Sequence, residues 1–217
     1  MITDADAFIR ANTRPLAPPL VPEITLHQAT EVTDIWEATE AKLEEIGLPP
    51  PFWAFAWAGG QALARYLMDN PDVVAGKTVL DFASGSGLGA IAAVKAGATT
   101  VLASEIDTFA GAAMQANAAI NNVAFDIVVE DVVGRHDPAW SVILAGDVCY
   151  EKAMADRIFA WLQVLANEGR TVLMGDPNRT YLPKTGLEPI AKYSVPTTRA
   201  IEDTDVRNAR VWRVLQG

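Results

Sequence analysis

The sequence predicts an α/β protein with a Rossmann-like, mostly parallel sheet, and three observations support this fold class. Short apolar runs alternate with helix-length segments from about residue 77 onward. A glycine-rich turn, VLDFASGSGLG, begins at the first of these runs. The last two apolar runs are joined by a polar segment too short for a helical crossover, so we expect them to pair antiparallel. Together these features predict a seven-stranded sheet with a C-terminal antiparallel hairpin and an N-terminal helical appendage.

The predicted parallel strands are short and almost continuously apolar, which is typical of strands covered on both faces. They are residues 78–82, 100–104, 126–130, 141–146 and 171–175. Helices are expected between them over residues 88–97, 108–120 and 152–167. A further helix is expected near 184–192, followed by the two hairpin strands, 192–201 and 209–216.

Residues 1–50 are expected to form the N-terminal helical appendage, and residues 51–217 the main domain, within one compact unit. A short helix should follow Thr3, and a second should run from about Thr33, as its N-cap, to Glu45. The prolines of PLAPPLVPEI exclude one continuous helix between them. The aromatic connector PPPFWAFAWAGG then leads into a helix over about residues 61–69.

Composition narrows the classes of partner. The chain has 217 residues, 17 of them basic and 27 acidic, for a net charge of −10. This argues against a nucleic-acid partner, because that affinity depends largely on Lys and Arg neutralising phosphates. No apolar run reaches bilayer length and the start, MITDADAFIR, has no secretory pattern, so a cytoplasmic protein without a membrane partner is expected.

Neither a disulfide nor a metal site is expected. Cys149 is the only cysteine, and no His, Asp or Glu spacing resembles a metal site. We interpret Cys149 as a small buried side chain, because a nucleophilic cysteine needs a base that neither His27 nor His136 is placed to supply. Both histidines are interpreted as surface or structural residues.

The glycine-rich turn is the predicted cofactor site, because open α/β sheets bind ligands where strands end. Gly85 and Gly87 allow close backbone approach to a ligand, and Gly89 opens the next helix. The glycines also fit the dinucleotide pattern G-x-G-x-x-G/A, so they do not choose between a nicotinamide cofactor and S-adenosylmethionine. Asp81 favours the latter, since its carboxylate would repel a pyrophosphate and attract the α-ammonium of the methionine part. The alternative is an ordinary strand-to-helix turn with a capping aspartate.

Acidic residues follow the next two strands. Glu105 is placed to accept hydrogen bonds from the ribose hydroxyls, with Asp107 as second choice or as a helix cap. Asp131 is placed to accept from the adenine amino group, or is a solvated loop residue. The aromatic residues before the domain either plug the core or, through Trp57, cover the methionine end of the cofactor.

The fourth strand runs into Asp147 and Tyr150, which are expected at the same edge as the cofactor. Methylation of an amine needs a neutral nucleophile, and a lysine with pKa near 10.4 costs about 4 kcal/mol to deprotonate at pH 7.4. A carboxylate can orient the ammonium and receive or relay its proton, and a dry aromatic wall lowers the amine pKa. Alternatively, Asp147 caps the next helix and Tyr150 fills the core. The segment 176–179 either recognises substrate or is a turn held by an ion pair.

Four segments carry a family resemblance: PFWAFAWAGGQALARYL, VLDFASGSGLGAIAA, ILAGDVCYE and MGDPNRTYLP. They resemble the electron-transfer-flavoprotein β-subunit lysine methyltransferases, which have the seven-stranded methyltransferase sheet and are often labelled nicotinamide N-methyltransferase-like. The resemblance covers roughly residues 45–217. It includes the Asp-x-x-Tyr motif of this group, here Asp147 to Tyr150, which would line the lysine channel.

This resemblance implies S-adenosylmethionine as cofactor and a protein substrate with accessible lysines, either the flavoprotein β-subunit or a ribosomal protein. It implies cofactor contacts from Trp57, Asp81, Ala83, Gly85, Glu105, Asp131 and Ala145. Ala83 departs from the family pattern, because many methyltransferases have glycine there. An alanine still permits close approach if its φ is negative, so cofactor binding is expected to survive.

The leading hypothesis is therefore protein-lysine N-methylation. A small-molecule N-methyltransferase with a nicotinamide-like acceptor is the second enzyme hypothesis, in which the N-terminal helices would form a lid. A nicotinamide-dependent oxidoreductase is disfavoured by Asp81, by the terminal hairpin and by the lack of a hydride-transfer residue set. A non-catalytic cofactor-binding module is the remaining alternative.

Overall fold

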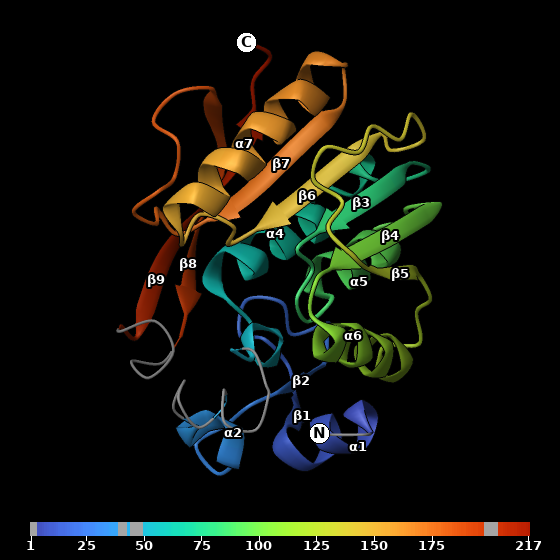
Figure 1. The fold of residues 1–217 in the computed structure, drawn as a ribbon, viewed down its shortest axis with the longest axis vertical. Coiled ribbons are helices and arrows are strands. Elements are labelled where there is room, and N and C mark those ends of the chain that lie inside the picture. The colour runs from blue at the N-terminus through green and yellow to red at the C-terminus, as the bar shows by residue number, and fades with distance from the viewer. Residues whose placement is uncertain (1–3, 39–42, 44–49, 198–203) are drawn as a thin grey trace.

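The computed structural model describes residues 4–38, 43, 50–197 and 204–217, with a seven-stranded sheet at its centre (Figure 1). The parallel strands are β3 (Thr78–Phe82), β4 (Thr100–Glu105), β5 (Asp126–Val129), β6 (Val142–Gly146) and β7 (Thr171–Asp176). The C-terminal strands, β8 (Leu187–Pro196) and β9 (Val206–Val214), pair antiparallel, and β9 also pairs antiparallel with β7. The strand order β5-β4-β3-β6-β7-β9-β8 confirms the predicted sheet. The order reverses between β3 and β6, the kind of switch point where such sheets bind ligands.

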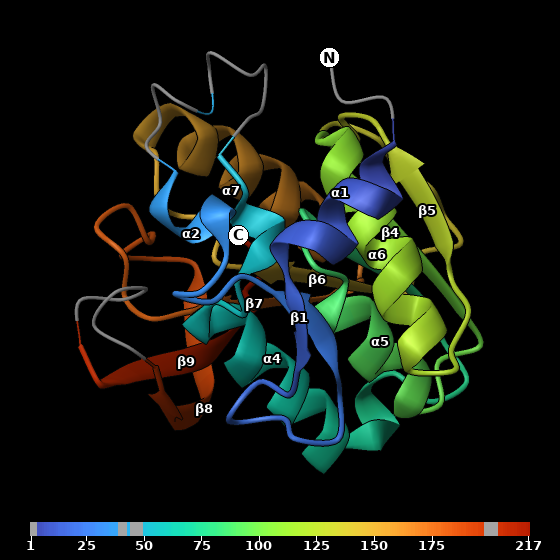
Figure 2. The same ribbon diagram turned by 90° about the horizontal axis from the view of Figure 1, so that it is seen from below.

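Helices cover both faces of the sheet (Figure 2). Those on one face are α4 (Ala58–Asp69), α5 (Leu88–Lys95) and α6 (Thr108–Ile120), and α7 (Lys152–Asn167) lies on the other. Val79, Leu144 and Leu173 belong to the apolar cluster of the first face. Their strand neighbours Leu80 and Ile143 belong to the cluster under α7. Burial on both faces explains the near-continuous apolar strands of the sequence.

Segment 184–192 was predicted as a helix, and this prediction is wrong. The chain enters β8 at Leu187 and stays extended to Pro196, with an irregularity in the pairing between Pro189 and Ala191. A helix here would contain a proline in its interior, which removes a hydrogen bond and clashes with the preceding turn. Pairing with β9 instead satisfies the backbone, and the irregularity accommodates Pro189 beside the edge.

The N-terminal segment contains the predicted first helix, α1 (Ala5–Asn12), which Asp4 caps by accepting from the Ala7 N–H. The second begins after Thr33 as predicted, but α2 (Asp34–Glu37) is short, and most of the predicted remainder lies outside the described residues. The segment also forms an unpredicted antiparallel pair, β1 (Arg14–Leu16) with β2 (Leu26–Gln28). The appendage is thus helical only in part.

The N-terminal segment shares the core of the sheet domain. Val21, Ile24 and Leu26 are fully buried in the same apolar cluster as α4 and α5. The connector forms a short 3₁₀ turn, η1 (Phe52–Ala54), and α4 then begins at Ala58, earlier than predicted. The division at residue 50 stays a prediction.

Candidate active site

A cavity of about 730 Å³ opens at the carboxyl ends of the parallel strands. Most of the predicted site residues line it: Trp57, Asp81, Ala83, Gly85, Glu105, Asp131, Asp147 and Tyr150. Gly87 and Ala145 are not on its wall. Ala145 is fully buried within β6, and its neighbour Gly146 faces the cavity instead. Sequence reasoning also missed Phe52 and Ser104, which lie on the wall.

Asp81 lies beneath the glycine-rich loop and is only 3% exposed. One carboxylate oxygen accepts from the Ala90 N–H at 2.8 Å and from the Ser84 hydroxyl. Burial raises the pKa of Asp81 to about 6. A Cβ on Gly89 would lie 2.5 Å from Asp81 Oδ1, so only glycine fits there. Asp81 therefore organises the loop, as the capping alternative required, and also faces the cavity.

The loop takes left-handed backbone conformations at three nearby positions, with φ of 51° at Ala83, 54° at Gly85 and 82° at Gly87. Ala83 therefore does not have the negative φ that would make alanine harmless, and carries modest strain. Gly87 is the N-cap of α5, and a Cβ there would approach Met114 Cγ at 3.1 Å. Its role is to let the loop turn against α6 rather than to face the cavity.

Glu105 ends β4 and holds the opposite side of the loop. Its Oε1 accepts from the Gly85 N–H at 3.0 Å, and its Oε2 accepts from the Ile106 N–H at 2.8 Å. Burial raises the pKa of Glu105 despite these hydrogen bonds. Asp107 caps α6 through the Phe109 N–H, as its alternative interpretation required. Asp131 is paired with Arg157 at 2.6 Å, which lowers the pKa of Asp131.

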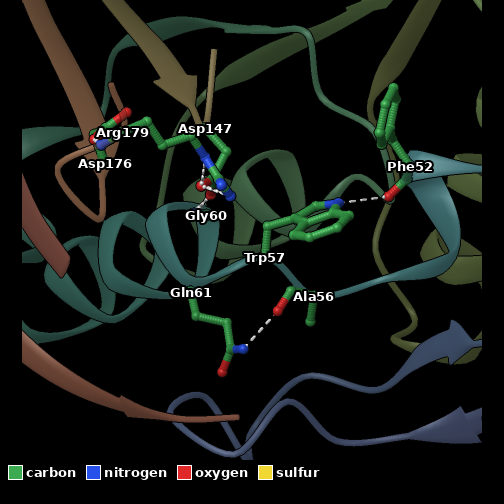
Figure 3. Close-up of polar contacts among 8 residues, drawn as sticks. All are labelled: Phe52, Ala56, Trp57, Gly60, Gln61, Asp147, Asp176 and Arg179. Carbon is green, nitrogen blue, oxygen red and sulfur yellow. Dashed lines mark hydrogen bonds and ion pairs between the residues drawn. The ribbon is translucent and has the colours of Figure 1, made fainter. Parts of the chain in front are cut away.

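Asp147 lies at the opposite end of the cavity, where β6, β7 and α4 meet (Figure 3). Its Oδ2 accepts from the Gly60 N–H at 2.7 Å. Its Oδ1 accepts from Nε and Nη2 of Arg179 at 3.0 and 2.7 Å. The Arg179 guanidinium also lies 5.6 Å from the centre of the Trp57 ring. Segment 176–179 is thus a turn held by an ion pair, and its role toward substrate stays a prediction.

Aromatic rings form the mouth of this end. Tyr150 is 49% exposed, so the core-filling alternative for it is wrong. Its ring lies 5.3 Å from that of Phe52, and the Phe52 ring lies 6.2 Å from that of Trp57. The Trp57 indole N–H donates to the Phe52 carbonyl at 2.9 Å, which fixes the ring against the cavity (Figure 3). Trp53, by contrast, is 2% exposed and packs in the core, as the core-plug alternative required. Trp57 lies on the cavity wall, and its contact with the cofactor stays a prediction.

The remaining candidates behave as interpreted. Cys149 is buried, and burial raises its thiol pKa to about 12, which leaves it unreactive. His27 is buried against Thr13, and His136 pairs with Glu168 at the surface. Within the described residues, no cluster of His, Cys, Asp and Glu is suited to a metal ion, and no helix has the length and apolarity to span a bilayer.

The residues on the wall fit a cofactor that carries a sulfonium, an ammonium and a ribose. Asp81 and Glu105 present carboxylates, which attract cationic groups and accept hydroxyl hydrogens. The buried Ser104 hydroxyl has no hydrogen-bond partner among the described residues. A Cβ added to Gly60 would meet nothing within 4 Å, so the wall is open beside Asp147.

Known proteins are similar to this chain in sequence and in fold. A model of the ribosomal protein L11 methyltransferase family (PrmA) matches residues 61–170. An electron transfer flavoprotein beta subunit lysine methyltransferase from Xenopus laevis is 38% identical over 95% of this chain and 85% of that protein. The chain belongs to this lysine methyltransferase family. The human relative is 36% identical over 95% of the chain and 80% of its own length.

Solved structures support the fold of this family member. A ribosomal protein L11 methylase from Lactobacillus delbrueckii covers 75% of the chain and 81% of its own, with TM-score 0.53 and 22% identity. A Synechocystis magnesium protoporphyrin IX methyltransferase crystallised with bound SAM covers 73% and 78%, with TM-score 0.53 and 16% identity. Together with the lysine methyltransferase relatives, these folds identify the chain as an S-adenosylmethionine-dependent methyltransferase.

Proposed function

We propose that this enzyme methylates lysine ε-amines of a protein, and that the protein is an electron transfer flavoprotein β-subunit. The observation that carries the proposal is the half-exposed aromatic mouth at Tyr150 and Phe52, with Asp147 behind it. An open mouth admits a side chain that is still attached to a folded protein. The names of the relatives supply the substrate class.

When bound, S-adenosylmethionine supplies a methyl group activated by its sulfonium. We assign Asp81 to the methionine ammonium, Glu105 to the ribose hydroxyls and Asp131 to the adenine amino group. Trp57, Ala83 and Gly85 would complete this wall. Gly87 would act only through the loop that it shapes.

At the acceptor end, Asp147 would accept a hydrogen bond from the lysine nitrogen and orient it toward the methyl group. Tyr150 and Phe52 would flank the aliphatic stem and exclude water from the reacting nitrogen. Both oxygens of Asp147 already accept hydrogen bonds from the protein, which fixes the direction of its carboxylate before a substrate arrives.

The test uses purified enzyme, radiolabelled S-adenosylmethionine and purified flavoprotein. Label on lysines of the β-subunit is expected, with at least a hundredfold loss in Asp147→Ala. A matched control is Asp156→Ala, which removes a surface carboxylate paired with Lys152 and should keep full activity. An enzyme that labels other acceptors and leaves the flavoprotein unlabelled would exclude this substrate.

A ribosomal protein is the second candidate, because residues 61–170 match the L11 methyltransferase family. The matched range includes the glycine-rich loop, Glu105 and Asp147. It does not include Phe52 and Trp57, the aromatic residues of the mouth that precede it. It therefore supports the cofactor more than the acceptor. Adding ribosomal protein L11 to the same assay, alone and in competition, separates the two. The cytoplasmic location stays a prediction, which cell fractionation would check.

A further inference from the structure

The positively charged side chain of Arg179 lies beside Asp147 at the acceptor end of the cavity. The side chain of Arg179 is 18% exposed and that of Asp147 is 9% exposed, so their ion pair is largely shielded from solvent. Two guanidinium nitrogens reach one carboxylate oxygen, and the guanidinium lies over Trp57. The Arg179 backbone N–H donates to Asp176 Oδ1 at 2.7 Å, which anchors the turn that presents the guanidinium (Figure 3).

This pairing changes what Asp147 can do. A guanidinium in contact with a carboxylate favours its ionised form and weakens its affinity for a proton. Asp147 is thereby suited to orient the acceptor nitrogen and poorly suited to take its proton. A lone buried carboxylate would have the opposite fault, since it would hold the lysine as an ammonium, which has no lone pair to react.

Other charged and titratable groups lie close to the pair. Arg179 acts electrostatically on Cys149 and Tyr150, from the loop after β6, and on Asp176, from β7. Glu105 on β4 acts on Tyr150, and Arg207 on β9 acts on Asp176. Burial raises the pKa of Cys149 to about 12 and that of Tyr150 above its usual value of 10.0, so neither gains a charge near neutral pH. Arg179 therefore supplies a positive charge in direct contact with Asp147.

We propose that Arg179 is a positioning residue that acts through Asp147, fixing the carboxylate as an acceptor and offsetting its charge so that the lysine reacts as a neutral amine. The identity of the acceptor rests on the proposed function. The ammonium gives one proton to solvent, and the lone pair that this exposes forms the bond to the methyl carbon as the carbon–sulfur bond breaks. The electron pair of that bond stays on sulfur, which leaves as the neutral thioether of S-adenosylhomocysteine. Asp147 keeps its charge throughout.

The first test needs no acceptor. Carbon-detected NMR of the aspartate carboxyls is followed against pH, with the Asp147 signal assigned from Asp147→Asn. In Arg179→Gln the titration midpoint of Asp147 should rise by about one pH unit or more. Arg179→Met replaces this variant if the glutamine form does not fold. An unchanged midpoint in the uncharged variants would overturn the proposal.

The matched control is Arg213→Gln, which breaks an exposed ion pair with Glu188 on β8 and β9 and lies outside the cavity. This variant should leave the Asp147 midpoint where it is in the wild type. Arg179→Lys keeps the charge without the planar fork, so its midpoint should stay closer to that of the wild type.

The second test is the pH–rate profile of methylation. Removing the Arg179 charge should hold the bound lysine ammonium more tightly, so the rising limb of kcat, which reports ionisations in the enzyme–substrate complex, should move to higher pH by about one unit in Arg179→Gln. Arg179→Lys should keep the limb in place with a lower kcat. A purely structural role would lower the rate equally at every pH, and that result would contradict the proposal.

The two tests also separate this inference from the proposed function. If the wild-type enzyme leaves the flavoprotein β-subunit unlabelled, the proposed substrate is wrong. The Asp147 titration in the free protein then still decides whether Arg179 controls this carboxylate.

Discussion

Asp81 combines a binding role with a cost in stability. Its pKa of about 6 in the folded protein lies above the 3.8 of an ordinary aspartate. Between these values the folded state binds more protons than the unfolded state, so the contribution of Asp81 is greatest below pH 4 and is lost as pH rises through 6. A shift of this size corresponds to about 3 kcal/mol. At neutral pH the buried, ionised Asp81 therefore lowers the free energy of unfolding.

Asp81→Asn removes this titration. Between pH 4 and pH 7 the wild type should lose up to about 3 kcal/mol of its free energy of unfolding through Asp81, and Asp81→Asn should not show this loss. Its affinity for S-adenosylhomocysteine should fall at least tenfold, because the ammonium loses its carboxylate. Denaturation at several pH values and calorimetry check both results. Asp126→Asn, an exposed position on β5, is the control. Tight binding by Asp81→Asn would rule out the ammonium contact.

Ala83 adopts a left-handed conformation that favours glycine. Ala83→Gly should therefore raise the free energy of unfolding by about 0.5–1 kcal/mol, after allowance for the greater freedom of glycine in the unfolded chain. Ala103→Gly, within β4, should lower it. Denaturant titration of both variants provides the measurement. A less stable Ala83→Gly would mean that the surrounding loop depends on the alanine methyl group.

The sequence was sufficient to locate Asp81, Glu105 and Asp147, because each lies at or directly after the carboxyl end of a strand and parallel strands end at one edge of a sheet. It could not predict that Arg179 contacts Asp147. That contact depends on β6 and β7 being neighbours and on the conformation of a turn, neither of which has a local signal. Phe52 was missed for a related reason, since a surface aromatic residue and a wall residue have the same sequence pattern.

At the scale of elements, α4 packs so closely against β7 that no side chain would fit at Gly59, where the two meet. A Cβ on Gly59 would lie 2.3 Å from the Gly175 carbonyl oxygen and 2.5 Å from Asp147 Oδ2. The same atom on Gly60 would meet nothing within 4 Å. Adjacent glycines on one helix thus have different functions: the first sets the distance between α4 and β7, and the second keeps the cavity wall open.

This difference predicts opposite effects on stability. Gly60→Ala should stabilise the protein by about 0.5–1 kcal/mol, because alanine favours the helix. Gly59→Ala should destabilise it by about 1–3 kcal/mol or more, and should also reduce methylation by displacing Asp147. Thermal unfolding of the two variants measures the contrast. Equal stability would show that α4 shifts easily on the sheet.

The errors at this scale came from tertiary context. Segment 184–192 was assigned to a helix on local pattern, yet Pro189 and the pairing partner β9 make it a strand. The β1–β2 pair was missed because its strands are short and one contains Pro15. Elements with a strong period and buried faces were predicted well, and short elements defined by their partners were not.

At the scale of the whole molecule, the N-terminal segment is tied to the cofactor loop through α6. Asn117 is fully buried, accepts from the His27 N–H at 2.7 Å and donates to the Ser86 carbonyl at 2.8 Å. One side chain therefore joins β2 to the glycine-rich loop. Asn121, one turn later, accepts from the Thr25 N–H and donates to the carbonyls of Thr25 and Asn117, so its side-chain hydrogen bonds among the described residues do not reach the loop.

Two variants separate these roles. Asn117→Ala and Asn121→Ala should each lower the free energy of unfolding by about 1–3 kcal/mol, because the first leaves buried and the second partly buried polar groups unpaired. Only Asn117→Ala should also weaken S-adenosylhomocysteine binding, by releasing the loop at Ser86. Calorimetry on both variants tests this. Equal affinities would mean that the N-terminal segment is independent of the cofactor site.

Cys149 is the only cysteine of the chain and its thiol is buried, so its rate of chemical labelling reports how often this region opens. A reagent such as a maleimide can modify it only in molecules whose β6 end has separated from α7. When reclosing is fast, the labelling rate divided by that of a free thiol gives the population of the open form. Because this residue lies between Asp147 and Tyr150, slower labelling in the presence of substrate would register how firmly the acceptor end closes, without any measurement of turnover.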